Sequence, residues 1–166
     1  FHIQNLEIHG GSNRYFIKKR SHKEQILSSV KDQRKKELKY GIHKLSTYKK
    51  FSKRVELSKK ELRKMFLKIA SKNNKIIGYG VTAKSTTILN YCKIGKEFIS
   101  YFIDTTKDKQ NKYTPGTKIP ILKYSGFIEK DVNFVFLGAW NFKKEIFNKE
   151  RKFIKRGGKF ITHTPR

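Results

Sequence analysis

The sequence predicts an α/β protein with a Rossmann-like parallel sheet and helices on both faces, preceded by a β-hairpin and two connecting helices. From residue 75 onward, short apolar β-forming runs alternate with helical stretches, which is typical of a parallel sheet covered by helices. Before residue 75, two β-like runs flank a Gly-Gly turn, and a long polar helical stretch follows. The chain therefore divides into three predicted zones, residues 1–20, 21–74 and 75–166.

Residues 1–20 are expected to form the hairpin. The runs Ile3–His9 and Asn13–Lys19 lie on either side of Gly10-Gly11-Ser12, which is a turn signal between strands. Two antiparallel strands alone are marginally stable in water. We therefore expect this hairpin to close the edge of a sheet whose remainder lies outside this chain. The first residue is Phe1 instead of Met, which also indicates a fragment of a longer protein.

Residues 21–74 are expected to form a connector of two helices. The first should begin at a capping box, Ser21–Glu24, and end at Tyr40-Gly41. The second should run from about residue 47 to Asn73-Asn74. Apolar residues at helical spacing predict a face of this second helix that packs against the third zone. They are Tyr48, Phe51, Val55, Leu62, Met65, Phe66 and Ile69.

Residues 75–166 are expected to form the parallel sheet. Strands are predicted at 76–79, 98–103, 119–122 (a short edge strand), 132–137 and 159–163, with helices at 83–92 and 143–156. Ligands of such folds bind outside the carboxyl ends of the strands. Those ends are Gly78–Lys84, Asp104–Gln110, Gly138–Asn141 and Thr162–Thr164.

The loop after the first of these strands has the composition of an anion site. Gly78 and Gly80 allow a tight turn, and the N–H groups at a helix start favour a bound anion. NAD binding is one interpretation, because Ala83 stands at the third position of a dinucleotide fingerprint and Asp104 lies near the distance of a ribose-binding acid. The polar residues that follow Lys84 argue against it, because they leave little room for close helix–strand packing. At this point the sequence leaves the phosphate-bearing ligand open.

Two further segments meet the same predicted edge of the sheet. The polar, basic loop 104–120 is long, and such a loop at a strand end more often serves a ligand than the fold. Trp140 offers a ring that stacks on a base or a sugar, and Asn141 offers an amide for a hydroxyl group. No carboxylate pair, and no His beside a nucleophile, gathers at this edge in the sequence. The edge is therefore predicted to bind a ligand more than to react with it.

The composition is strongly basic, with 40 Lys and Arg against 13 Asp and Glu and a net charge of +27. Such a surface binds nucleic acid non-specifically. A basic nucleic-acid-binding module is thus a further alternative, although the basic residues are spread out and no DNA- or RNA-reading motif accompanies them. The single cysteine, Cys92, excludes an internal disulfide and a Cys-cluster zinc site. No signal peptide or membrane-length apolar run is visible, so we expect a cytoplasmic protein without a membrane partner.

Several blocks together are specific enough to indicate a family. Residues 78–92, GYGVTAKSTTILNYC, resemble the signature of the C-terminal domain of SAM-dependent sugar-nucleotide C-methyltransferases, which methylate a carbon of an NDP-keto-deoxysugar. Val81-Thr82 and Gly138 depart from the usual pattern of that family. The other blocks agree in order and spacing, so the resemblance covers nearly the whole chain. They are His9–Ser12, Asp104, Lys109–Pro120, Ala139–Phe142 and Gly157–Phe160.

This resemblance implies a division of labour within a longer enzyme. Full-length members carry a zinc-binding region and a SAM-binding domain, so S-adenosylmethionine is expected mainly outside this chain, zinc only there, and no metal here. The mechanism would be proton abstraction beside a keto group, followed by attack of the enolate on the SAM methyl group. The fragment would contribute binding of the nucleotide diphosphate-sugar and lack methyl transfer by itself, with His9 as a weak catalytic candidate. The expected substrate-binding residues are Gly78, Gly80, Thr82, Lys84, Ser85, Thr86, Asp104, Lys109, Gln110, Tyr113, Trp140 and Asn141.

Overall fold

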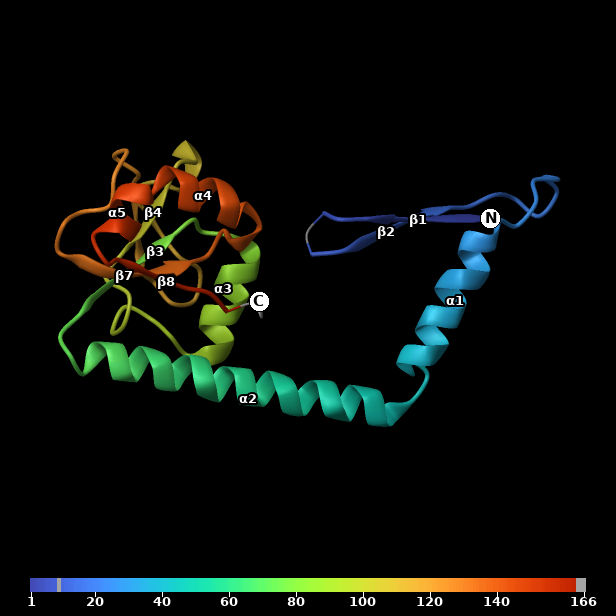
Figure 1. Ribbon diagram of the computed structural model, residues 1–166, viewed down its shortest axis with the longest axis horizontal. Coiled ribbons are helices and arrows are strands. Elements are labelled where there is room, and N and C mark those ends of the chain that lie inside the picture. The colour runs from blue at the N-terminus through green and yellow to red at the C-terminus, as the bar shows by residue number, and fades with distance from the viewer. Residues whose placement is uncertain (9, 164–166) are drawn as a thin grey trace. The chain divides into compact units, whose positions relative to one another are not determined.

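The computed structural model describes residues 1–8 and 10–163 (Figure 1). The chain divides into two compact units, Phe1–Val55 and Glu56–Arg166. The long helix α2 (Leu45–Ala70) contributes residues to both. No helix in the described ranges is long and apolar enough to cross a membrane.

The first unit contains the predicted hairpin. Strands β1 (His2–Leu6) and β2 (Ser12–Phe16) pair antiparallel in an unbroken register from His2–Phe16 to Leu6–Ser12. Helix α1 (Ser28–Tyr40) packs on β1 through Ser29, whose Oγ lies 2.8 Å from Nδ1 of His2 and accepts the N–H of Ile3 at 3.2 Å. The hairpin prediction is confirmed.

The predicted start of α1 is wrong, whereas its predicted end is correct. The helix begins at Ser28, after an N-cap residue, Leu27, that provides no side-chain cap. The proposed capping box, Ser21–Glu24, lies in irregular chain, where the Lys18 ammonium donates to two backbone carbonyls. Those carbonyls are satisfied without a helix. At the other end Gly41 adopts φ +77° and donates its N–H to the last carbonyls of α1, a left-handed cap that suits glycine.

Helix α2 confirms the predicted packing face only in its last part. Leu62, Phe66 and Ile69 are buried in the core of the second unit, whereas Tyr48 and Phe51 in the first unit are exposed. Length accounts for the difference. Twenty-six residues span about 39 Å of helix, which is roughly twice the length of a strand of five or six residues, such as those of the second unit.

The second unit is built on a six-stranded sheet in the order β5-β6-β4-β3-β7-β8. The strands are β3 (Lys75–Tyr79), β4 (Phe102–Asp104), β5 (Lys112–Tyr113), β6 (Pro120–Lys123), β7 (Val132–Leu137) and β8 (Lys159–Ile161). All neighbouring pairs are parallel except β5 with β6. The predicted edge strand at 119–122 is therefore wrong in position, because β6 has β5 on one side and β4 on the other.

Helices cover both faces of this sheet, which confirms the Rossmann-like prediction (Figure 1). Helix α3 (Ala83–Cys92) and the last part of α2 share one core with Phe102 and Phe136. Helices α4 (Lys143–Lys149) and α5 (Arg151–Lys155) share the other core with Val135. Short 3₁₀ turns, η1 (Lys107–Lys109) and η2 (Trp140–Phe142), follow β4 and β7.

The single helix predicted at 143–156 is interrupted at Glu150, which separates α4 from α5. The Glu150 carboxylate is buried and accepts a hydrogen bond from the Tyr124 hydroxyl at 2.5 Å. A single amphipathic helix over residues 143–156 would be expected to expose the charged Glu150 side chain. The hydrogen bond from Tyr124 holds this side chain in the interior instead.

Candidate functional site

A cavity of about 280 Å³ opens at the carboxyl ends of β3, β4 and β7. The strand order reverses at β3, because β4 and β6 lie on one side of it and β7 and β8 on the other. Open α/β sheets bind ligands at such a reversal. The cavity is lined by Tyr79, Gly80, Val81, Thr82, Asp104, Thr105, Thr106, Lys109, Ala139, Phe142, Glu145, Ile146 and Lys149.

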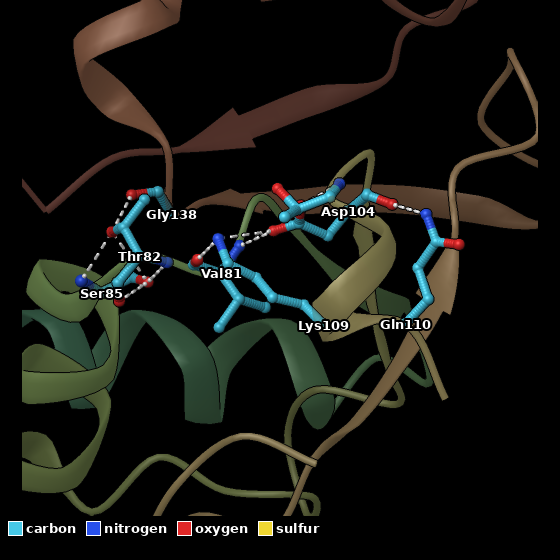
Figure 2. Close-up of polar contacts among 8 residues, drawn as sticks. Val81, Thr82, Ser85, Asp104, Lys109, Gln110 and Gly138 are labelled. Atoms are coloured by element: carbon cyan, nitrogen blue, oxygen red, sulfur yellow. Dashed lines mark hydrogen bonds and ion pairs between the residues drawn. The ribbon is translucent and has the colours of Figure 1, made fainter. Parts of the chain in front are cut away.

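Asp104 is the centre of the polar network beside the cavity (Figure 2). Its carboxylate is only 6% exposed and accepts the N–H of Val81 at 2.7 Å and the N–H of Thr106 at 2.8 Å. The Lys109 ammonium lies 3.5 Å from the same carboxylate and donates to the carbonyl of Val81 at 2.7 Å. Gln110 donates its side-chain N–H to the backbone carbonyl of Asp104 at 3.0 Å. Asp104 thus holds the loops after β3 and β4 together.

The charged form of Asp104 is stabilised in this setting. Burial alone would raise the pKa of the carboxyl, but the hydrogen bonds from Thr106 and Val81 and the nearby Lys109 charge outweigh burial and lower the pKa below its ordinary value. A carboxylate that is ionised and held by two N–H groups is a weak base. The arrangement is therefore suited to positioning a loop more than to removing a proton.

The glycine loop uses its own N–H groups within the protein. The N–H of Gly80 donates to a carbonyl of β4, that of Val81 to Asp104, and that of Thr82 to the Ser85 hydroxyl. In dinucleotide-binding folds, a phosphate accepts such N–H groups. Here the Asp104 carboxylate is the anion that the loop binds. The loop shapes the cavity without offering these three donors to a ligand.

Thr82 and Ser85 form a capping box at the start of α3. Thr82 Oγ1 accepts the N–H of Ser85 at 3.1 Å, and Ser85 Oγ accepts the N–H of Thr82 at 2.9 Å. Thr82 Oγ1 also donates to the carbonyl of Gly138 at 3.0 Å (Figure 2). The two hydroxyls that the sequence suggested for a ligand therefore bond to the protein itself, and they tie α3 to the end of β7.

Close backbone approach explains the glycines of this region. A Cβ on Gly80, which has φ +76°, would lie 2.5 Å from the Cβ of Ala139, and a Cβ on Gly138 would lie 2.1 Å from the carbonyl oxygen of Gly80. Gly78 lies inside β3, where a Cβ would meet the Phe102 ring at 2.2 Å. Because Gly80 and Gly138 lack a Cβ, the backbone segments that follow β3 and β7 can approach each other closely at the switch point.

The structure brings some of the predicted site residues to the cavity and places others elsewhere. Gly80, Thr82, Asp104 and Lys109 line it. The others lie on neighbouring elements outside its lining. Lys84 places its ammonium 5.1 Å from the centre of the Trp140 ring. The remaining predicted residues outside the lining are Gly78, Ser85, Thr86, Gln110, Tyr113 and Asn141.

The α4 wall was missed from the sequence. Phe142, Glu145, Ile146 and Lys149 line the cavity from the start and body of α4. Glu145, Ile146 and Lys149 follow Phe142 by three, four and seven residues. This spacing is the local signal in the sequence that these side chains share one face of a helix.

A buried tyrosine pair lies beneath this wall. Desolvation and the nearby Glu150 raise the pKa values of Tyr79 and Tyr124 far above their ordinary value, so both hydroxyls stay protonated. Tyr124 donates to Glu150, and the Lys149 ammonium lies 4.3 Å from the Tyr124 ring centre. This network connects the floor of the cavity to the junction between α4 and α5.

His9, the proposed catalytic candidate, lies outside the described residues. His163 lies just after β8 with its ring against Phe136, and its buried Nδ1 has no hydrogen-bond partner within the described chain. In the same described ranges, no group of three or more His, Cys, Asp or Glu residues is arranged to hold a metal ion.

The fold and the switch-point cavity define a Rossmann-like α/β domain with a glycine loop closed by an internal carboxylate. The sequence profile described as the C-methyltransferase C-terminal domain matches residues 7–165, so the chain belongs to this family. One similar protein is the C-methyltransferase NovU of Streptomyces niveus, 29% identical over 163 residues, which are 98% of this chain and 39% of that protein. The chain thus spans about two fifths of this relative. Family membership favours the methyltransferase interpretation over an NAD-binding protein or a nucleic-acid module.

Proposed function

We propose that this chain is the nucleotide-sugar-binding part of a SAM-dependent methyltransferase that acts on a carbon of an NDP-keto-deoxysugar. The observation that carries the proposal is the cavity at the switch point, in a chain that belongs to the C-methyltransferase C-terminal domain family. Small ligands of α/β sheets bind at such points. The smallest typical ligand sites have volumes of roughly 300 Å³. The cavity volume of about 280 Å³ is close to this lower limit and suits one part of a nucleotide sugar.

The chemistry of the cavity supports a binding role. Methyl transfer to carbon needs a base that removes a proton beside the keto group and a methyl donor that the resulting enolate attacks. Asp104 has a lowered pKa and two N–H partners, so it is a poor choice for that base. These properties favour a base supplied by the rest of the enzyme.

The residues present do not fit SAM. A Rossmann-type site for this molecule would present loop N–H groups and an acidic residue at the end of the second strand. Here the N–H groups of Gly80, Val81 and Thr82 are bonded within the protein, and the acidic residue, Asp104, is one of their acceptors. We therefore assign SAM to the remainder of the longer enzyme and place no methyl-transfer step on these residues.

The first unit also supports a place in a longer enzyme. Among the described residues, the buried apolar side chains all lie at Leu62 or beyond, whereas Tyr15 and Ile17 at the end of the hairpin are exposed. A hairpin gains stability by packing its apolar side chains against further structure. We propose that the SAM-binding domain supplies that structure and that the hairpin closes its sheet.

Calorimetric titration of the chain with GDP-, UDP- and dTDP-hexoses tests the binding role. At least one should bind more tightly than NADH, whereas binding of a DNA duplex should fall steeply with salt. Thr105→Trp fills the cavity from an exposed position on its lining and should weaken sugar-nucleotide binding by roughly tenfold or more. Thr87→Trp, on an exposed turn of α3 away from the cavity, is the matched control. Equal affinity of both variants and the unaltered chain would refute the assignment.

A further inference from the structure

The α4 wall of the cavity carries three chemically different side chains in a row. Phe142 immediately precedes α4, Glu145 lies in its first turn and Lys149 is its last residue, and all three line the cavity. Positions i, i+3 and i+7 share one helix face. At 1.5 Å per residue, Glu145 lies about 4.5 Å and Lys149 about 10 Å along the helix from Phe142.

Each of the three groups has a distinct preference for a ligand. The Phe142 ring is 59% exposed at the cavity, and an exposed ring in such a place stacks on a nucleobase. A carboxylate such as that of Glu145 accepts hydrogen bonds from hydroxyl groups. The ammonium of Lys149 pairs with phosphate oxygens. Base, sugar and diphosphate are connected in this same order in a nucleoside diphosphate, over a similar length.

Two other lysines near the cavity, Lys109 and Lys84, have their ammonium groups in contacts within the protein. The Lys109 ammonium donates to the carbonyl of Val81 and faces the carboxylate of Asp104. The Lys84 ammonium lies over the Trp140 ring, outside the cavity lining. Lys149 is exposed and lies on the cavity wall with its ammonium over the Tyr124 ring, and none of the ion pairs among the described residues involves it.

We infer that this wall reads the nucleoside diphosphate, with Phe142 stacking on the base, Glu145 accepting hydrogen bonds from the ribose hydroxyls and Lys149 pairing with the diphosphate. The inference rests on the proposed function and deepens it. It assigns recognition of the nucleotide to side chains of one helix, whereas the glycine loop contributes shape only. A site built to bond a hydroxyl discriminates strongly against a ligand that lacks it.

Matched pairs of variant and ligand test this assignment in the 166-residue chain by calorimetry. UDP and GDP, each with its 2′,3′-dideoxy counterpart, probe Glu145. We expect removal of both hydroxyls to weaken binding roughly tenfold or more in the unaltered chain and less than about threefold in Glu145→Ala. The affinity for UDP relative to uridine, and for GDP relative to guanosine, probes Lys149. We expect Lys149→Ala to lose most of the preference of the chain for the diphosphate over the nucleoside. Lys152→Ala, on α5 away from this cavity, should keep it.

The outcomes separate this inference from the proposed function. One outcome refutes the α4 assignment alone. In it, nucleoside diphosphates bind, Thr105→Trp weakens their binding, and Glu145→Ala and Lys149→Ala distinguish the paired ligands as strongly as the unaltered chain does. The cavity assignment then stands. If no nucleoside diphosphate or sugar nucleotide binds, both proposals fall. Phe142→Ala should weaken a nucleoside and its diphosphate by a similar factor, because it removes only the stacking surface.

Discussion

Asp104 ties the loops after β3 and β4 together, and Asp104→Asn tests that role with little change in side-chain volume. The carboxylate accepts two backbone N–H groups, at 2.7 and 2.8 Å, from a site that is 6% exposed. An asparagine amide has one acceptor oxygen, so one of these N–H groups would face an NH₂ group. Leaving a buried donor unsatisfied costs about 1–3 kcal/mol. Loss of the pair with the half-exposed Lys109 adds about 0.2–1 kcal/mol.

We therefore expect Asp104→Asn to lower the free energy of unfolding of the second unit by about 2–3 kcal/mol. Urea unfolding followed by fluorescence of Trp140, the single tryptophan, reports on this unit. With a urea m-value of about 2 kcal/mol/M, the midpoint should fall by about 1 M without a change in m. Asp108→Asn is the matched control, because it removes the same charge from an exposed position on η1. Equal midpoints for both variants would refute the reasoning.

The pH dependence gives an independent check with a defined sign. The pKa of Asp104 is lower in the folded chain than its ordinary value of 3.8, so the unfolded chain takes up the proton first as the pH falls. The stability contributed by the ionised carboxylate is complete above about pH 5 and is lost as the pH falls through 3.8 toward the folded pKa. The difference in stability between the unaltered chain and Asp104→Asn should shrink over that interval. A difference that stays constant from pH 7 to about pH 3 would contradict the assignment.

Two further substitutions test the packing that forms the site. Gly80→Ala should destabilise the second unit by about 2 kcal/mol or more, because the new Cβ would lie 2.5 Å from that of Ala139 at a residue with positive φ. The control is Gly126→Ala, which has a positive φ but no neighbour within 4 Å. Thermal unfolding should show a smaller loss of stability for this control. Arg63→Ala removes the guanidinium that donates to the last carbonyls of α3 and should cost about 1–2 kcal/mol in urea unfolding, whereas the exposed Lys64→Ala should change stability by less than about 0.5 kcal/mol.

The elements that the sequence predicted well are those whose signals are local. The segment 75–92 shows this, because an apolar run, a glycine turn and a polar helix start follow one another along the chain. The start of α1 shows the opposite. A capping pattern at Ser21–Glu24 is outweighed by Lys18, which satisfies the carbonyls of that segment from the preceding strand end. The place of β6 inside the sheet likewise depends on β5, a two-residue strand too short to recognise in sequence.

The candidate site divides in the same way. Gly80, Asp104 and Lys109 were predicted at the cavity because the carboxyl ends of neighbouring parallel strands meet at one edge. Which groups they bind was beyond prediction, because the bond from Val81 to Asp104 joins residues 23 positions apart. The spacing of Glu145, Ile146 and Lys149 indicates that they share a helix face, but the direction of that face depends on the 3₁₀ turn η2, whose geometry has no distinct sequence signal.

A glycine loop that binds its own carboxylate has a consequence for specificity. In dinucleotide-binding folds, the loop N–H groups hold the phosphates, so the ligand and the backbone geometry are linked. Here the Asp104 carboxylate satisfies the loop from within the protein, and side chains on α4 form another wall of the cavity. Exposed side chains on a helix face change with little cost to the fold. If the α4 wall binds the nucleotide as we infer, the same domain would accept different nucleotides by substitution at positions such as 142, 145 and 149, while its loop, its glycines and the Asp104 network stay constant.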